Sequence, residues 1–170
     1  MGSLPSHASA SHSPTSHSLG DLLLPNAVIA RARWHGRKQV LQEMSVVMAQ
    51  ALGLKSRDVF EAVMERERLG STGVGEGVAI PHARIESLKR PVGGFARLLE
   101  PADFEAIDER KADLVFMLLA PSDAGAEHLR ALARAARVFR QEQVRSALRK
   151  AQTEDAILAI LCPDKVTDAA

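Results

Sequence analysis

The sequence is poor in the residues that would cross-link a chain or anchor it in a membrane. It has one cysteine, Cys162, so no internal disulfide can form, and this usage is typical of a reducing compartment. No apolar run approaches the ~18 residues that a membrane helix needs. The N-terminus also lacks the basic and apolar regions of a secretory signal. The sequence therefore predicts a cytoplasmic protein that is not embedded in a membrane.

Aromatic residues and net charge are also scarce. Only 4% of the residues are aromatic, and 22 basic against 21 acidic residues leave a formal net charge of +1. This balance does not concentrate nucleic acid or anionic lipid around a protein. One alternative stays open, a nucleic-acid surface made by Arg130, Arg134, Arg137, Arg140, Arg145 and Arg149. A solvated helix surface is favoured, because few aromatic side chains stand among these arginines.

Composition divides the chain into a tail, one domain and a short C-terminal tail. Residues 1–20 are rich in Ser, His, Ala and Pro and too poor in large apolar groups to offset the entropy of ordering them, which predicts disorder. Three histidines recur there, but without carboxylates or cysteines beside them they predict no metal site: His7, His12 and His17. Residues 21–162 are long enough to form one domain with its own core, and 163–170 are predicted to be a tail.

Apolar spacing predicts five helices. One spans Arg37 to Leu52, and a second runs from about Ser56, a plausible cap, to Gly70. A third carries apolar residues at helical spacing, namely Leu129, Leu132, Ala133 and Ala136. Two shorter helices are expected over 141–151 and 153–161.

Two apolar runs predict strands, "GFARLL" at 94–99 and "DLVFMLLAP" at 113–121. The second run is apolar on both faces, which is typical of a central strand covered on both sides. A third, short strand is expected inside a glycine-rich segment between the helices and these runs. This order predicts a mixed α/β sandwich.

The glycine-rich segment is "GSTGVGEGVAIPHARI", residues 70–85. Gly73, Gly75 and Gly77 permit positive φ and leave amide groups uncovered, so the loop could cradle an anion. A Walker motif would require Gly-Lys-Ser or Gly-Lys-Thr, which the segment lacks. His82 follows Pro81 at the end of the expected short strand, and a neutral imidazole there could act as a nucleophile toward a phosphoryl group.

Two further residues could assist His82. Arg66 ends the second predicted helix, and its guanidinium suits phosphate oxygens. His128 lies in the first turn of the third helix, where free amides and the helix dipole favour an anion. Spacing alone leaves ordinary structural roles open for all three side chains. A hydrolase triad of Ser71, His82 and an aspartate also stays formally open, although no Gly-x-Ser-x-Gly motif is present.

Two stretches, "RERLGSTGVGEGVAIPHARI" and "FEAIDERKADLVFMLLAPSDAGAEHLRALARAARVFR", resemble a known family. They resemble the IIA components of the fructose and mannitol branch of the bacterial phosphoenolpyruvate phosphotransferase system, and within it the nitrogen-related regulatory type. The resemblance extends from about Leu22 to Leu161. It implies a mixed sheet of about five strands with helices on both faces. One departure is "DERKAD" at 108–113, where relatives often have proline before a valine-aspartate pair.

The resemblance also implies roles for individual residues. His82 would accept a phosphoryl group from a small HPr-like carrier protein, with His128 as the second active-site histidine and Arg66 near the phosphate. The loop lining the pocket would comprise Ser71, Thr72, Gly73, Gly75 and Gly77. No cofactor or metal is expected, because the incoming phosphohistidine is already activated.

Two functions within the family remain possible. A nitrogen-type IIA protein uses its phosphorylation state to choose partners, which in the family include sensor kinases and potassium-transport proteins. A sugar-transport IIA component instead passes the phosphoryl group to a IIB protein. The closer likeness to the nitrogen type favours the regulatory function.

Overall fold

The computed structural model describes residue 2 and residues 18–167. Six strands form one mixed sheet in the order β1-β5-β6-β3-β2, and β4 also pairs with β6. The strands are β1 (Leu23–Ala32), β2 (Gly73–Gly75), β3 (Val78–Ala79), β4 (His82–Ile85), β5 (Val92–Ala102) and β6 (Ala112–Pro121). The helices are α1 (Gly36–Leu52), α2 (Ser56–Leu69), α3 (Gly125–Arg140), α4 (Glu142–Lys150), α5 (Glu154–Leu161) and α6 (Pro163–Thr167).

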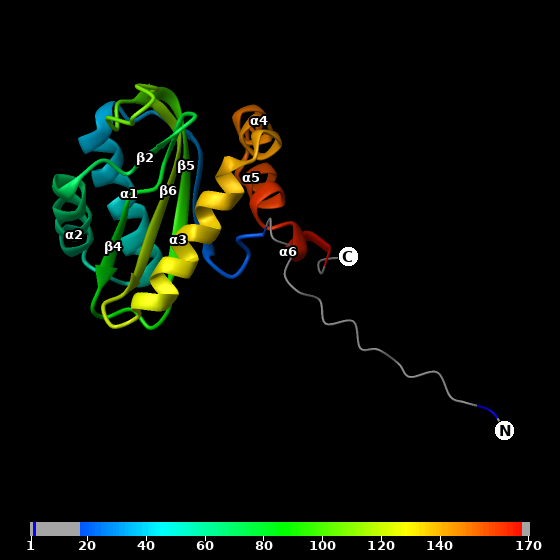
Figure 1. Cartoon of the computed structure of the whole chain (residues 1–170), viewed down its shortest axis with the longest axis horizontal. Coiled ribbons are helices and arrows are strands. Elements are labelled where there is room, and N and C mark those ends of the chain that lie inside the picture. Colours follow the sequence, from blue (N-terminus) through cyan, green and yellow to red (C-terminus); the bar gives the residue numbers. More distant parts are fainter. Residues whose placement is uncertain (1, 3–17, 168–170) are drawn as a thin grey trace.

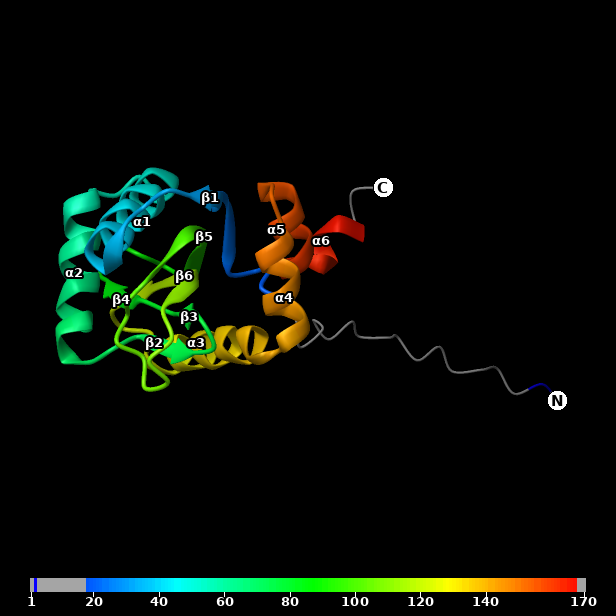
Figure 2. The same ribbon diagram turned by 90° about the horizontal axis from the view of Figure 1, so that it is seen from above.

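The sheet lies between two helical layers. Helices α1 and α2 cover one face, and α3 to α5 lie on the other side (Figures 1 and 2). The predicted mixed sheet with helices on both faces is confirmed. Among the described residues, no helix combines the length and apolar character needed to cross a membrane.

Strand β6 is the centre of the core. Successive side chains of a strand point to opposite faces, and those of β6 alternate between two buried clusters. One cluster packs under α3, α4 and α5 and takes Leu114, Phe116 and Leu118. The other packs under α1 and α2 and takes Val115, Met117 and Leu119. The prediction that this apolar run is a strand covered on both faces is therefore confirmed.

Strand β1 was not predicted. It pairs in parallel with β5, and its register shifts between Leu23 and Val28 and again between Ile29 and Ala32. These irregularities remove the two-residue alternation by which a strand is recognised in a sequence. The strand thus depends on its neighbours in the sheet more than on its own pattern.

The packed chain begins earlier than the predicted boundary at residue 21. Leu19 is fully buried, and its N–H donates to the carbonyl oxygen of Leu161 at 2.7 Å. Residues 18–20 therefore pack with the domain, because the side chain of Leu19 joins the core cluster that includes α5. The rest of the predicted tail, with His7, His12 and His17, lies outside the described residues. At the other end, part of the predicted 163–170 tail forms α6.

Two helix predictions need correction. Helix α2 begins at Ser56, but its N-cap is Lys55, so Ser56 is not the cap. In α3 the side chains that face the core include Ala131, Ala135 and Val138, whereas Leu129 is 64% exposed. The core face of α3 is thus formed mostly by small residues, and the leucine is on the exposed side.

An interruption between strands β3 and β4 sets the position of His82. Strands β3 and β4 share one edge of β6: Val78 pairs with Leu114, and His82 pairs with Leu118. Between the two strands, Ile80 N–H turns to the carbonyl oxygen of Thr72 at 2.9 Å, and Pro81 has no N–H to give to a ladder. His82 therefore begins a new strand instead of ending the previous one as predicted.

Candidate active site

Three predicted site residues meet at one cavity. Arg66 comes from the last turn of α2, His82 from the start of β4 and His128 from the first turn of α3. Arg66 Nε lies 3.2 Å from His82 Nε2, and the two histidine rings lie 5.6 Å apart, centroid to centroid, in a T-shaped arrangement. The cavity measures about 520 Å³, and Arg84, Leu69 and Leu129 also line it. Residues distant in the sequence thus form one polar group in a partly apolar pocket.

The hydrogen bonds of His82 assign its two ring nitrogens. Nδ1 lies 2.8 Å from the carbonyl oxygen of Ile80, which accepts hydrogen bonds only, so Nδ1 carries the proton. Nε2 then presents a lone pair, toward which Arg66 Nε donates. Burial holds the pKa of His82 below its ordinary value, the Ile80 carbonyl opposes this, and the charge of Arg66 adds to it. The lowered pKa thus favours a neutral imidazole whose Nε2 carries the lone pair.

His128 leaves a polar atom unpaired. Its side chain is buried, at 5% exposure, and its Nδ1 has no hydrogen-bond partner among the described residues. Burial lowers the pKa of His128, and the neighbouring His82 and Arg84 lower it further. An unsatisfied buried polar group costs stability, so His128 is held in the cavity wall at an energetic cost.

Arg66 and its neighbour also shape the loop that leads to His82. Arg66 Nη1 donates to the carbonyl oxygen of Gly70 at 3.0 Å. The Thr72 hydroxyl donates to the buried Glu67 carboxyl group, and the Ser71 hydroxyl donates to the Phe104 carbonyl. Ser71 and Thr72 therefore fix the loop and do not line the cavity. Because the Ser71 hydroxyl is bonded away from His82, the hydrolase triad has no support in the geometry.

Glu67 was missed by sequence reasoning. Burial raises the pKa of its carboxyl group above the ordinary value, although the hydrogen bond from Thr72 opposes the shift. Its second oxygen, Oε2, is buried without a partner among the described residues. In the run "MERERL" it is one of several alternating charges, and nothing in that pattern marks it as the buried one.

The structure does not bring Gly75 and Gly77 to this cavity. They flank Glu76 in the turn between β2 and β3, with φ of +90° and +77°. The turn lines a separate cavity together with Phe139 at the far end of α3. At 1.5 Å per residue, that position lies about 16 Å along the helix axis from His128. Gly73 pairs with Ala79 and lies close to Ala106, and it does not line the cavity either.

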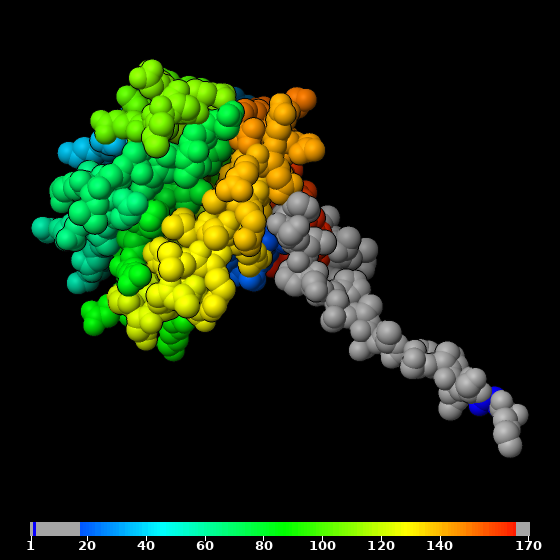
Figure 3. Space-filling model, in the orientation of Figure 1, coloured from blue at the N-terminus to red at the C-terminus, as the bar shows by residue number. Residues whose placement is uncertain are grey.

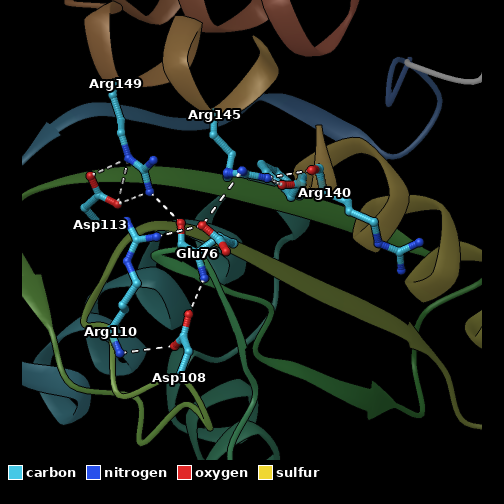
Figure 4. A network of polar contacts seen from close by, with 8 residues as sticks. Glu76, Asp108, Arg110, Asp113, Arg140, Arg145 and Arg149 are labelled. Carbon is cyan, nitrogen blue, oxygen red and sulfur yellow. Dashed lines mark hydrogen bonds and ion pairs between the residues drawn. The ribbon is translucent and has the colours of Figure 1, made fainter. Parts of the chain in front are cut away.

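The groups of the turn are already occupied by protein partners (Figure 4). The Glu76 N–H donates to the Asp108 carboxylate at 2.8 Å, and Arg149 Nη2 donates to the Glu76 carbonyl oxygen at 2.7 Å. Arg110 pairs with the Glu76 carboxylate, and Arg149 also pairs with Asp113. The turn is therefore not an open anion-binding nest. Three of the residues in this network, Asp108, Arg110 and Asp113, belong to the stretch 108–113, where the sequence departs from the family pattern.

The arginines of the nucleic-acid alternative are partly neutralised within the protein. Arg134 pairs with Asp21, Arg149 pairs with Asp113, and Arg145 donates to the carbonyl oxygens of Phe139 and Arg140. Because these charges are engaged, the six arginines do not form one free basic face. The geometry gives no support to a nucleic-acid interface.

Comparison with known families defines the class of this protein. The family model "Phosphoenolpyruvate-dependent sugar phosphotransferase system, EIIA 2" matches residues 21–162. The chain therefore belongs to this EIIA family and is a component of a phosphotransferase system.

Individual relatives indicate which type of EIIA protein the chain resembles. A nitrogen regulatory protein of Bradyrhizobium diazoefficiens is 44% identical over 149 residues, which cover 88% of this chain and 97% of the relative. The crystal structure of the nitrogen regulatory protein IIA-Ntr from Neisseria meningitidis superposes with a TM-score of 0.78 at 36% identity, covering 84% of this chain and 97% of that one. The resemblance to the nitrogen-related type is confirmed.

A sugar-transport relative also matches. The fructose-specific EIIABC component of Bacillus subtilis is 37% identical over 142 residues, which cover 83% of this chain and 22% of that protein. The match to this relative is confined to about a fifth of its length.

Proposed function

We propose that His82 accepts a phosphoryl group at Nε2 from the phosphohistidine of a small HPr-like carrier protein. The observation that carries this proposal is the orientation of the ring: Nδ1 is bonded to the Ile80 carbonyl, and Nε2 faces the cavity beside Arg66. The depressed pKa of His82 adds support, because the neutral ring is the nucleophilic form.

The transfer needs no group beyond the two proteins. The Nε2 lone pair forms a new N–P bond as the N–P bond of the carrier breaks, and the electrons of that bond stay on the imidazole of the carrier. The proton on Nδ1 of His82 stays on that nitrogen throughout, hydrogen-bonded to the Ile80 carbonyl oxygen. Arg66 turns from the Nε2 lone pair to the phosphoryl oxygens, and His128 supplies a further donor. Both act by position and charge.

The phosphorylation state of His82 then controls which regulatory partner binds. A phosphoryl group adds about −1.5 to −2 charges at neutral pH. Here the charge would appear beside an apolar rim, where Leu69 is 82% exposed and Leu129 is 64% exposed. A partner that covers this rim in one state would meet a buried charge in the other. By family resemblance, such partners include sensor kinases and potassium-transport proteins, and the site of action is the cytoplasm.

A relay function is the second candidate. The name of the Bacillus subtilis relative is that of a fructose-specific EIIABC component, and 37% identity to it favours a transfer from His82 to a IIB protein. A IIB protein added to the phosphorylated chain distinguishes the two functions. Rapid discharge of His82 would favour the relay, and slow discharge together with phosphorylation-dependent partner binding would favour regulation.

Intact-mass measurement tests the central step. The chain is incubated with phosphoenolpyruvate, the first enzyme of the system and an HPr-like carrier. We expect an acid-labile gain of one phosphoryl group that is abolished in His82→Gln. His35→Gln is the matched control, because His35 is exposed and pairs with Glu100 away from the cavity. A gain that persists in His82→Gln, or no gain with several carriers, would contradict the proposal.

A further inference from the structure

A second cavity, of about 640 Å³, is lined by α3 and by the segments at 21–22 and 90–91. Figure 3 shows α3 in yellow at the surface, with the blue residues that follow residue 18 beside it. Four arginines line the cavity, Arg90, Arg130, Arg134 and Arg137, and we call it the arginine cavity. It shares no lining residue with the cavity at His82.

The arginines of α3 are crowded by the helix itself. Arg130, Arg134 and Arg137 are spaced by four and three residues, so their side chains stand on successive turns of one face. Like charges at this spacing repel each other. The guanidinium groups of Arg130 and Arg137 have neither an ion pair nor a hydrogen bond with any described residue, although the backbone carbonyl of Arg137 accepts a hydrogen bond from Gln141. The helix therefore carries two cationic groups that the described chain does not neutralise.

The other two arginines are held in place. Arg134 donates to the Ser18 carbonyl oxygen at 3.1 Å and to the Asp21 carboxylate at 2.7 Å. Arg90 donates to the Asp21 carbonyl oxygen at 3.0 Å. Asp21 is thus engaged already, and Glu127 is the second carboxylate on the wall. Four guanidinium groups against two carboxylates leave an excess of positive charge around the cavity.

The floor of the arginine cavity is apolar. Leu22 and Ala131 are buried beneath it, and Pro91 forms one side. Small-molecule sites are concave, mostly apolar and bounded by a few oriented polar groups, with volumes of about 300–1,000 Å³. An extended acidic peptide or nucleic acid would have to pass its charges along Asp21 and Glu127. A compact anion meets less of this wall, and the carboxylate of Asp21 is already paired with Arg134.

We infer that the arginine cavity binds a small phosphate compound, an organic phosphate or diphosphate. Its phosphate oxygens bond to Arg130 and Arg137, and its uncharged part covers Leu22 and Pro91. Guanidinium groups suit phosphate oxygens because they donate two parallel N–H bonds. This site is separate from phosphoryl transfer at His82 and does not depend on it.

Titration calorimetry of the full chain at low ionic strength tests the inference, with ADP, pyrophosphate and adenosine as probes. We expect ADP and pyrophosphate to bind, ADP the more tightly, and adenosine not to bind. Arg130→Gln and Arg137→Gln should each weaken ADP binding about tenfold or more, since each removes hydrogen bonds to a charged group. Arg140→Gln is the matched control, because Arg140 lies on the same helix outside the cavity.

Several results would overturn the inference. Failure of both anions to bind would do so, as would equal weakening by Arg140→Gln. Loss of ADP binding in Arg66→Gln would place the anion at His82 instead. Binding of polyglutamate or an oligonucleotide with the same dependence on Arg130, without binding of the small anions, would make the surface a macromolecular one. Mass measurement of His82 phosphorylation and thermal unfolding of each variant show that the fold is intact, independently of ADP binding.

Discussion

The two ends of the segment from Gly70 to Ile85 differ in how their polar groups are paired. At the turn around Glu76, the Glu76 N–H, its carbonyl oxygen and its carboxylate all have protein partners. At His82, Arg66 donates to a neutral ring, and Nδ1 of the adjacent His128 has no partner in the described chain. The polar groups of one end are all paired within the protein, whereas the other end keeps a buried nitrogen without a partner in the described chain.

The difference separates polar groups that are paired within the protein from those that we propose to act on a phosphoryl group. Arg149 meets the Asp113 carboxylate at 3.0 Å, so its charge is satisfied locally and stabilises the turn. Arg66 meets no carboxylate in a hydrogen bond or ion pair among the described residues, and the groups it touches are Gly70 O and His82 Nε2. Unpaired groups cost stability, and at a functional site that cost is offset when the ligand binds. The pairing of its groups, more than its glycine content, distinguishes an anion site.

The largest expected effect is that of substituting Arg66 on the rate of His82 phosphorylation. Arg66→Gln removes a charged donor from the phosphoryl group, so we expect the rate of His82 phosphorylation to fall by about 10²–10³-fold. Arg68→Gln is the matched control, since Arg68 lies in the same last turn and is exposed. Stopped-flow or rapid-quench phosphorylation by the carrier measures both. Equal rates for the two variants would mean that Arg66 has no part in the transfer.

A substitution at the turn should lower the stability of the fold and leave the rate of His82 phosphorylation unchanged. A Cβ at Gly77 would overlap Arg149 Nη2 and lie 3.0 Å from Asp113 Oδ1, in addition to the strain of φ +77°. We expect Gly77→Ala to lower the free energy of unfolding by about 2 kcal/mol, part from strain and part from displaced hydrogen bonds. Urea unfolding measures this loss, while the rate of His82 phosphorylation should stay unchanged.

Gly53→Ala provides the control for backbone strain. Gly53 has φ +69°, but a Cβ there meets no atom within 4 Å. Its cost should therefore be about 1 kcal/mol, the strain alone. If Gly77→Ala cost no more than Gly53→Ala, the network around Glu76 would contribute nothing to stability. If Gly77→Ala slowed phosphorylation strongly, the turn would belong to the active site after all.

Local patterns predicted most of the fold. The buried run of β6 was predicted because every residue from Leu114 to Ala120 is apolar. Strand β1 was missed because it follows no alternation. The buried face of α3 was assigned to the wrong side chains, because Leu129 is apolar but lines the His82 cavity. A pattern records that a residue is apolar, and only the tertiary structure shows whether it faces the core or a partner.

The site was predicted less evenly. Arg66, His82 and His128 were proposed from their chemistry and given roles by the family resemblance, and the structure brings them together. Gly75 and Gly77 were proposed as an anion-binding loop and by the same resemblance, yet they lie at the far end of α3 because the chain forms a hairpin between Gly73 and Ala79. Glu67 could not be predicted, since its burial depends on the packing of α2 against the loop at Thr72.

The pH dependence of stability should give the smallest effect. Burial lowers the pKa of both His82 and His128, so near their ordinary value of 6.5 the unfolded chain binds more protons than the folded one. The free energy of unfolding should therefore fall as the pH is lowered from 7.5 to 5.5, within limits of about one proton for each histidine. Urea unfolding across this range measures the slope. His82→Gln with His128→Gln should flatten it, while Gly77→Ala should lower the whole curve and keep the slope, because the turn holds no histidine. An unchanged slope in the double variant would show that the two rings take up protons equally in both states, and that the cavity does not hold them neutral.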